Sequence, residues 1–327
     1  MKVTRKEFKG FAAVVFCIAS WMLAGAAIAQ AWPAKAIEVI VPFPPGAVDT
    51  RVRIVSDKVS KILGKPLVIQ NRPGAGFRIG TDALLRAPKD GYTIGVLAQA
   101  NGAITPALDP NAGYDVRKDL TLLTLVYETP LVFVVHPSLG VNTITDFIKL
   151  AKKQPGKLNY GAAAGASAYR LWFEVFMTLA GIELQHIPYK GTAPALLDLA
   201  GGRTQAALGD AGVKPFVEVG KMVVLATTGS QRSPMFPNAP TIQESGVPFV
   251  ANTWLGFAAP SNLPREVNQR LVEAFAEAVR SPDVRAAIEA GGGDVLLGLG
   301  PAAFQVRVDE EIQKFRRIGA QLNIKIE

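Results

Sequence analysis

The sequence predicts an α/β protein in which mostly parallel strands are flanked by helices, in a chain of 327 residues that is long enough for two domains. Two observations support this fold class. Short apolar runs are followed by Gly- or Pro-rich turns and then by stretches whose apolar residues have helical spacing. In addition, the order of strand, small-residue loop and helix occurs twice, beginning at Val39 and again at Lys157.

The first strand and helix set the pattern. Val39–Val41 is a short apolar run typical of a strand buried on both faces, and the prolines and glycine that follow it end the strand. A helix is expected next, with Asp49 or Thr50 as its cap and Gly64 at its end. A helix that begins directly after a tight loop directs free backbone N–H groups and a positive dipole end at one place. We therefore expect half of an anion-binding site here.

The same alternation continues to the C-terminus. Further strands are expected at 66–70, 92–97, 120–126, 131–135, 157–160, 182–188, 205–209, 222–227 and 253–259. Further helices are expected at 79–86, from Thr145 to the Gln154–Gly156 turn, at 169–180, from Thr192 to Gly201, after Pro264, and at 282–290 and 301–322. The segment 230–248 is rich in Pro, Ser and Asn, so it is expected to be irregular.

The first 29 residues have the features of a secretory signal peptide. Basic residues precede an apolar run from Phe11 to Ala27, and Ala27–Ala29 forms a small-residue cleavage site. The alternative is a membrane anchor, but the run is shorter than the ~20 residues of a usual span. The single cysteine, Cys17, lies inside the run after Phe16, so neither a lipid anchor nor a disulfide is expected.

Charge and motifs narrow the function. The net charge is +8, of which the leader supplies +3, and this modest basic excess suits an anionic ligand. We find no Lys/Arg cluster with interleaved aromatic residues, so nucleic acid is not an expected partner. His136 and His186 both adjoin prolines in apolar runs and are expected to be structural. Because nucleophile elbows, phosphate loops and metal-ligand spacings are missing, no catalytic residue, metal or cofactor is predicted.

Backbone-rich loops remain as the candidate site. Small residues leave main-chain N–H groups accessible, and they occur at Gly46, Ala47, Gly76 and Ala164–Ala166, with the Ser167 hydroxyl at the second helix start. The alternative is that these residues serve only tight turns. A Gly-x-Gly loop at 74–80 does not match the dinucleotide fingerprint, because its third glycine comes one residue late.

Several ordered motifs resemble those of the Bug-type, TctC-like solute-binding proteins of tripartite tricarboxylate transporters. The resemblance runs from about Trp32 to the C-terminus. It is carried by Pro42–Gly46 with Asp49, Asn71–Gly76, Pro88–Thr93, Gly156–Gly161, Pro188–Gly191, Arg232–Pro234 and Trp254–Pro260.

This resemblance implies a two-lobed periplasmic-binding-protein fold, type II-like, that closes on a small carboxylate. Lobe 1 would comprise 30–128 with 254–327, and lobe 2 would comprise 129–253, with crossings near 126–131 and 252–254. The 43–49 and 164–167 loops would hold the carboxylate through main-chain N–H groups, hydroxyls and water. The protein would be a periplasmic monomer without a cofactor that delivers its solute to membrane permease subunits. The alternative role with the same fold is the ligand-binding component of a signalling system.

The sequence departs from the family pattern at three places. The first loop is one residue shorter before Asp49 than the family pattern. Where the family's second loop continues Gly-Gly-Asn, Gly76 is here followed by Phe77 and Arg78. Near the second helix start, where the family often has a histidine, this chain has Tyr169 and Arg170. Phe77 would stack on an aromatic acid and Arg170 would pair with a second carboxylate, unless both point to solvent. Asp49 is expected to act as a helix cap first and a ligand contact second. The expected ligand-binding residues are Phe43, Pro45, Gly46, Ala47, Asp49, Gly76, Phe77, Ala164, Gly165, Ala166, Ser167, Arg170, Tyr189 and Asp210.

Overall fold

The computed structural model describes residues 32–165, 167–290 and 295–322. The predicted signal peptide, residues 1–29, and the predicted site residue Ala166 lie outside the described residues. The chain divides into a segment that ends at Ala34 and a compact unit that begins at Lys35, and this unit contains both β-sheets.

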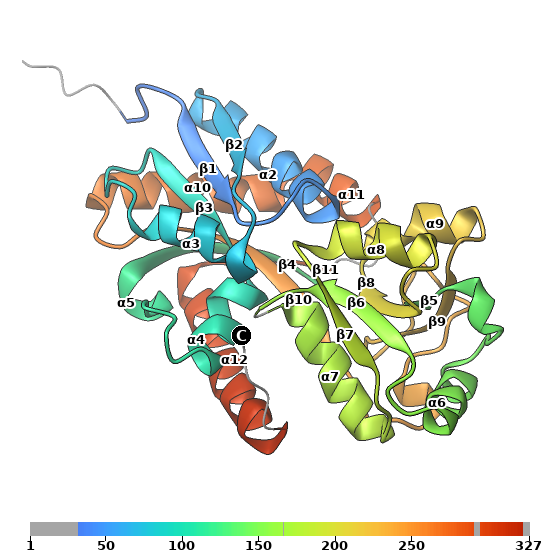
Figure 1. The fold of residues 1–327 in the computed structure, drawn as a ribbon. Helices are drawn as coiled ribbons and strands as arrows, with labels where there is room; N and C mark the ends of the chain where they lie inside the picture. The colour runs from blue at the N-terminus through green and yellow to red at the C-terminus, as the bar shows by residue number, and fades with distance from the viewer. Residues whose placement is uncertain (1–31, 166, 291–294, 323–327) are drawn as a thin grey trace, which may run out of the picture. The chain divides into compact units, whose positions relative to one another are not determined.

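The first sheet has six strands in the order β11-β4-β10-β3-β1-β2. Its strands are β1 (Ile37–Val41), β2 (Leu67–Asn71), β3 (Thr93–Ala98), β4 (Leu120–Pro130), β10 (Asn252–Pro260) and β11 (Val295–Leu299). β1 pairs in parallel with β2 and β3, whereas β10 is antiparallel to β3 and β4, and β11 is antiparallel to β4. Figure 1 shows β4 and β10 side by side.

The second sheet has five strands in the order β7-β6-β8-β5-β9. They are β5 (Val132–Val135), β6 (Asn159–Ala163), β7 (Gln185–Tyr189), β8 (Ala206–Gly209) and β9 (Val223–Thr227). β6 is parallel to β7 and β8, and β5 is antiparallel to β8 and β9. The prediction of mostly parallel sheets is therefore wrong in detail. Both sheets are mixed, because β4 runs into β5 through a single residue and the chain returns to the first sheet through β10.

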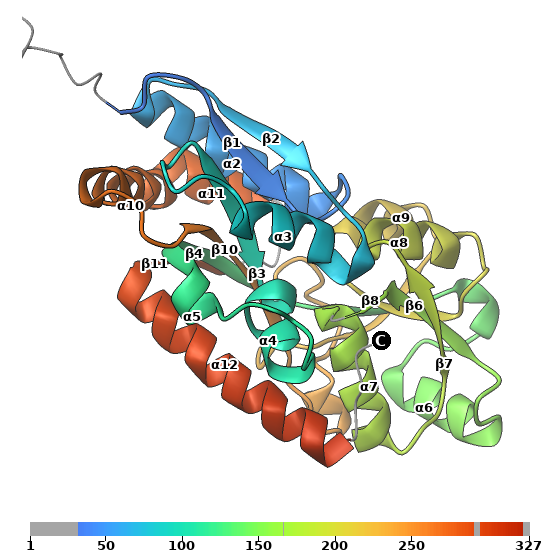
Figure 2. The same ribbon diagram turned by 60° about the vertical axis from the view of Figure 1, so that its left-hand side comes forward.

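Helices flank both sheets. They are α2 (Ala47–Leu63), α3 (Arg78–Leu85), α4 (Thr105–Leu108), α5 (Val116–Asp119), α6 (Ile144–Lys153), α7 (Ala168–Ala180), α8 (Thr192–Ala200), α9 (Lys214–Glu218), α10 (Arg265–Arg280), α11 (Pro282–Ala290) and α12 (Pro301–Leu322). α2 packs against α10 and α11, and α12 packs against α4 and β4 (Figure 2). α7 and α8 both contact β6 and β8 of the second sheet.

Local sequence explains these elements. The inward residues of α2, such as Val52, Val55 and Val59, are buried, and Gly64 adopts a left-handed conformation at the helix end. In the second sheet, Phe133 packs against Phe147, Phe173 and Phe176, with ring centroids 5.0 to 5.2 Å apart. Aromatic packing therefore fixes α6 and α7 on this sheet.

Most predicted elements are confirmed with boundaries shifted by a few residues, but some local predictions are wrong. Thr143, not Thr145, opens α6, because the Thr143 hydroxyl accepts a hydrogen bond from the Asp146 N–H. Strand β4 continues to Pro130 instead of ending at Val126. The sequence analysis does not predict β11, because this short apolar run follows a turn-forming stretch of three glycines and Asp294.

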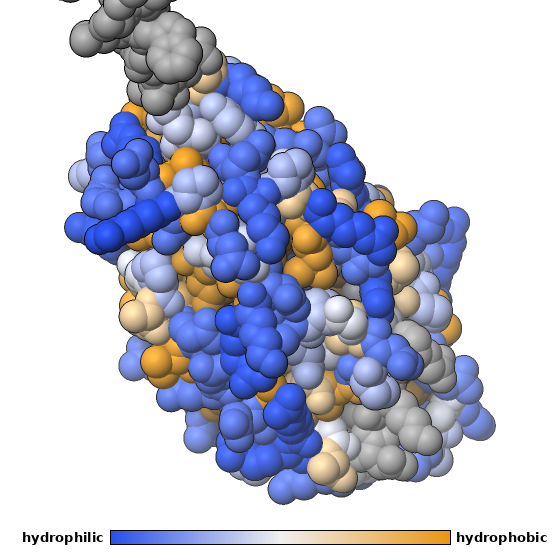
Figure 3. Space-filling view, turned by 90° about the vertical axis from the view of Figure 1, so that its left-hand side faces the viewer, coloured by the Kyte–Doolittle hydropathy of each residue, from blue (hydrophilic) through white to orange (hydrophobic). Residues whose placement is uncertain are grey.

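Two surface properties bear on function. Among the helices that the structure describes, none combines the length and apolar character that crossing a membrane requires. On the face shown in Figure 3, apolar residues occur in small separate groups among hydrophilic ones. This face thus offers no broad apolar patch.

Candidate functional site

The turn between β1 and α2 forms one side of the candidate site. Gly46 is the N-cap of α2, and no described side chain caps this helix start. The prediction that Asp49 or Thr50 caps the helix is wrong, because the helix begins two residues before Asp49. The first N–H groups of an α-helix lack partners within the helix, so this start presents donors to a ligand or to water.

Asp49 holds this turn in place through hydrogen bonds. Its carboxylate is buried and accepts hydrogen bonds from Arg53 Nε at 2.7 Å and from Asn71 Nδ2 at 2.8 Å. The same Asn71 amide donates to the Phe43 carbonyl at 3.0 Å. Asp49 therefore ties the Phe43 turn to the end of β2, and its charge is already compensated by Arg53.

The start of α7 has a different arrangement. The Ser167 side chain is 1% exposed and caps α7 by accepting a hydrogen bond from the Arg170 N–H at 3.4 Å. The Ala164 N–H donates to the Tyr189 carbonyl at 2.9 Å. The predicted use of the Ala164 N–H as a ligand donor is therefore wrong, because β6 pairing with β7 extends to this residue.

The loops from the two sheets lie directly against each other. Gly165 has a left-handed φ of 68°, and a Cβ placed on it would lie 2.8 Å from Gly76 Cα. A Cβ on Gly191, the N-cap of α8, would lie 2.6 Å from Pro44 Cγ. The start of α8, which also lacks a side-chain cap, is thus a third helix start at the site that sequence reasoning did not include.

Three cavities lie in succession between these loops. An outer groove of about 310 Å³ is lined by Phe43, Pro44, Gly46, Val48, Thr192, Ala193, Leu196, Leu197, Asp210, Gly212 and Phe216. An inner cavity of about 30 Å³ shares Phe43, Val48 and Asp210 with the groove and is further lined by Phe77, Ala98, Ala100, Tyr127, Thr129, Ser167, Ala168, Tyr169, Thr253, Trp254 and Leu255. Gly76, Phe77, Arg78 and Gly165 line a polar cavity of about 270 Å³ together with Asn101 and Tyr114.

Trp254 lines the inner cavity and carries a buried donor. The residue is 1% exposed, and its indole Nε1–H has no hydrogen-bond partner among the described residues. The ring is held in place by Phe304, whose ring lies at 89° to it with centroids 5.5 Å apart. A buried donor without a partner is unfavourable by about 1 to 3 kcal/mol, so this group is suited to a polar ligand.

Asp210 and Tyr169 place a hydrogen-bonded acid at the same cavity. The Tyr169 hydroxyl donates to Asp210 Oδ2 at 3.1 Å, and the Gly212 N–H donates to Oδ1 at 2.9 Å. Burial, followed by the nearby Asp210 charge, raises the pKa of Tyr169 well above its usual value. The phenol therefore stays protonated and keeps Asp210 as an acceptor.

Some predicted residues lie elsewhere. Pro45 is exposed, and it lines none of the three cavities. Arg170 pairs with Glu174 at 2.7 Å and lines a separate surface cavity beside α6. The Tyr189 hydroxyl donates to Asp198, and burial together with this bond raises its pKa to about 12. Ala47 is the first residue of α2.

The predicted structural role of the histidines agrees with their contacts. His136 Nδ1 lies 2.8 Å from Ser138 Oγ, and His186 Nε2 lies 3.3 Å from the Ala162 carbonyl. Within residues 32–165, 167–290 and 295–322, no group of three or more His, Cys, Asp and Glu side chains could hold a metal ion.

Comparison with known proteins identifies the family. The family model described as "Tripartite tricarboxylate transporter family receptor" matches residues 51–324. The chain belongs to this family. It is 34% identical to Protein BugT of Bordetella pertussis over 314 residues, which cover 93% of this chain and 96% of BugT.

Solved structures agree with this assignment. Periplasmic binding protein BugD has a TM-score of 0.85 with 27% identity, covering 90% of this chain and 100% of BugD. Rpa4515 of R. palustris, solved with adipate, has a TM-score of 0.86 with 31% identity, covering 90% of this chain and 99% of Rpa4515. The fold is therefore the two-lobed fold of Bug-type solute-binding receptors, as the sequence motifs predicted.

Sequence reasoning missed Trp254 as a site residue, although Trp254 stands in one of the motifs that carried the resemblance. Tyr127, Thr129 and Thr253 were missed as well. All four lie on β4 or β10. The predicted crossings at 126–131 and 252–254 could have indicated these residues, because segments that connect two lobes lie at the base of the cleft between them.

Proposed function

We propose that this protein binds a small carboxylate in the inner cavity and delivers it to the permease subunits of a tripartite tricarboxylate transporter. The lobes would be 30–128 with 254–327 and 129–253. Strand membership supports this division, because β1 to β4, β10 and β11 form one sheet and β5 to β9 form the other. The family to which the chain belongs supports the transporter role and a periplasmic location.

The observation that carries the proposal is that Ser167 and Trp254, whose buried Nε1–H has no partner among the described residues, line the same cavity. We expect a carboxylate bound there to accept a hydrogen bond from each of these two side chains. Hydrogen bonds to a charged group contribute about 1.5 to 3 kcal/mol each. Apart from Asp210, Thr129 and Thr253, the other side chains that line the cavity are aromatic or apolar, and they restrict the access of water and strengthen those bonds.

The start of α2 would provide the second set of donors. Its N-cap, Gly46, lines the outer groove, which shares three residues with the inner cavity. The aligned peptide dipoles of this 17-residue helix favour negative charge at that end. Asp210 faces the same space with its charge, so the solute carboxylate is expected at the Trp254 side of the cavity.

The size of the inner cavity restricts the solute. A volume of about 30 Å³ holds about two water molecules. A solute with a larger body therefore requires the two loops to separate and close again around it. We propose that the solute is a compact acid, bound by a monomer through closure of the lobes.

The test is a thermal-shift screen with acetate, propanoate, malonate, benzoate and adipate, using protein purified after secretion of the full-length chain. A ligand that binds only the native state raises the melting temperature by mass action. We expect a concentration-dependent rise with at least one short acid and none with the matching amide. The absence of a rise with all acids in the panel would contradict the proposal.

A further inference from the structure

Phe77 separates the inner cavity from the polar cavity. Among the described residues it is the one that lines both spaces, and its side chain is buried at 5% exposure. Its ring lies 4.9 Å from the ring of Phe43, and Phe77 forms one buried cluster with Ala100 and Ala163. Because Ala100 follows the first sheet and Ala163 belongs to the second, the ring forms a wall held from both sides of the cleft.

Phe77 adopts a backbone conformation that is unfavourable for a residue with a side chain. Phe77 has a φ of 75°, in the left-handed region that favours glycine. It follows Gly76, whose φ is 60°, and directly precedes α3. A glycine at position 77 would fit this backbone, so the ring can be removed without remodelling the loop.

The space behind the wall has a distinct chemistry. The polar cavity holds about 270 Å³, nine times the volume of the inner cavity. Its guanidinium, Arg78, donates to the Asn111 carbonyl at 2.6 Å and lies 3.7 Å from both Asp82 and Asp109. Asp109 lines the cavity together with Arg78, whereas Asp82 lies outside the lining and also pairs with Arg86 at 3.8 Å. Arg78 is thus already engaged by both carboxylates and offers a second solute carboxylate no spare positive charge, whereas a hydroxyl or ammonium end can donate to Asp109.

We propose that Phe77 sets the maximum length of the solute, so that the protein accepts compact acids and excludes acids whose chain would reach the polar cavity. This inference rests on the proposed carboxylate function. If the wall is removed, the polar cavity receives the far end of a longer acid, with a preference for a hydroxyl or ammonium end.

The test compares Phe77→Gly with the unmodified protein by isothermal titration calorimetry. The probes are propanoate, hexanoate, 6-hydroxyhexanoate, 6-aminohexanoate and adipate. We expect the unmodified protein to bind propanoate at least about tenfold more tightly than the six-carbon acids. In Phe77→Gly, this ratio falls about tenfold or more for 6-hydroxyhexanoate and 6-aminohexanoate, and it falls less for adipate.

Two further variants separate cavity opening from other effects. Asn262→Gly relieves another left-handed residue, with φ 63°, in an exposed loop after β10, and it should keep the original length profile. Phe77→Leu keeps an apolar wall and should stay close to the original profile even if Phe77→Gly folds poorly.

Each contrary outcome has a separate meaning. If the ratio of the affinity for propanoate to the affinity for the six-carbon acids is the same in the unmodified protein and in Phe77→Gly, the role of Phe77 is overturned. If adipate gains most from the glycine, the charge argument for the polar cavity is overturned. If the unmodified protein binds no acid at all, the proposed function fails, whatever Phe77 does.

Discussion

Trp254 and Trp172 are both buried tryptophans, but their donors have opposite environments. The Trp172 Nε1–H donates to Gln99 Oε1 at 3.1 Å, and Gln99 in turn donates to Glu311 at 2.6 Å. Lys314 lies over the Trp172 ring at 4.7 Å. The Trp254 Nε1–H has no described partner, although its ring is equally well packed.

This difference separates structure from function. Trp172 joins α7 to α12 through a chain of satisfied hydrogen bonds, so its polar atom contributes to stability. Trp254 carries a buried donor that costs stability while the cavity is empty and is repaid when an acceptor binds. Substitutions to phenylalanine keep an aromatic side chain at both positions but remove the N–H, so Trp172→Phe should mainly lower stability and Trp254→Phe should mainly lower affinity.

The largest expected effect is the loss of stability in Trp172→Phe. The change leaves Gln99 without its donor in a fully buried position and weakens the contact with Lys314. We expect the free energy of unfolding to fall by about 2 to 4 kcal/mol, measured by urea denaturation. Carboxylate affinity should be unchanged, and a selective loss of affinity would break the comparison.

Trp254→Phe should show the reverse. Removing the donor weakens binding of the acid identified in the screen by about 1.5 to 3 kcal/mol, measured by calorimetry. Stability without the acid should fall less than in Trp172→Phe, because removal of an unpaired buried N–H offsets part of the cost of the smaller ring. An equal fall in stability with unchanged affinity would place Trp254 in the same structural class as Trp172.

Ser167→Ala sharpens the comparison at a second residue that lines the inner cavity. Loss of the α7 cap should cost about 1 kcal/mol of stability, and loss of the hydroxyl should weaken acid binding about tenfold. Thr143→Ala is the matched control, because Thr143 caps α6 through the Asp146 N–H. The control should lose similar stability without loss of affinity. Equal affinities in the two variants would exclude Ser167 from the site.

Asp210→Asn tests the charge inside the cleft. A neutral amide removes repulsion between Asp210 and the solute carboxylate, so the affinity for a simple acid should rise by about 1 kcal/mol. Titration calorimetry at low and high salt would measure this change. A simple acid carries no donor for Asp210, so weaker binding of such an acid to Asp210→Asn would contradict the repulsion between Asp210 and the solute.

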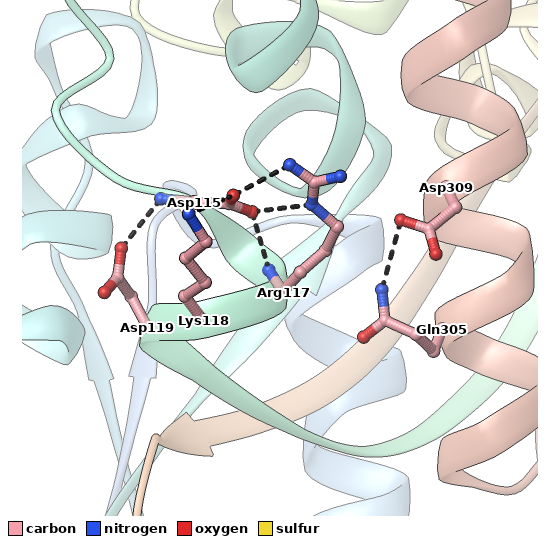
Figure 4. Close-up of polar contacts among 6 residues, drawn as sticks. All are labelled: Asp115, Arg117, Lys118, Asp119, Gln305 and Asp309. Atoms are coloured by element: carbon pink, nitrogen blue, oxygen red, sulfur yellow. Dashed lines mark hydrogen bonds and ion pairs between the residues drawn. The ribbon is translucent and has the colours of Figure 1, made fainter.

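The smallest expected effect is at Asp115, the N-cap of α5 (Figure 4). Its carboxylate accepts from the Arg117 N–H at 3.0 Å and from the Arg117 guanidinium at 2.8 Å. The Arg117 side-chain hydrogen bond is the main reason that the pKa of Asp115 is lowered. A lowered pKa in the folded state stabilises the protein above the unfolded value near 3.9, and this stabilisation is lost as pH falls through the folded value.

Asp115→Asn should therefore cost about 0.5 to 1 kcal/mol at pH 7. The difference from the unmodified protein should shrink as pH falls below about 4, and chemical denaturation at both pH values would measure it. A difference that does not depend on pH would mean that the amide loses packing instead of an ionic hydrogen bond.

The sequence was sufficient for the elements and for the loops of the site, because both depend on local patterns. Val39–Val41, the Gly46 turn and Ser167 were found from periodicity and turn chemistry. The α2 cap was misplaced because Asp49 is a good capping residue by type, whereas its partners, Arg53 and Asn71, became visible only through packing.

Long-range pairing set the limit of sequence reasoning. The sequence predicts a free N–H at Ala164, but this group donates to the Tyr189 carbonyl at the end of β7. The sequence also predicts that Arg170 is available to a ligand, but Arg170 forms an ion pair with Glu174, one turn further along α7. Trp254 was read as part of a strand motif. Its indole N–H is buried and has no described partner because of neighbours from β4, η2 (Ala100–Ile104) and α12. These neighbours are distant in sequence, so a local pattern cannot reveal them.

The most direct test of the central claim follows the indole N–H signals by ¹H–¹⁵N NMR during titration with the acid identified in the screen. Beyond the predicted leader the chain contains Trp32, Trp172 and Trp254, so the signals can be assigned with Trp254→Phe. We predict that the Trp254 indole proton moves downfield in proportion to the bound fraction while the Trp172 signal stays in place. An acid that binds and leaves the Trp254 signal unmoved would contradict the account.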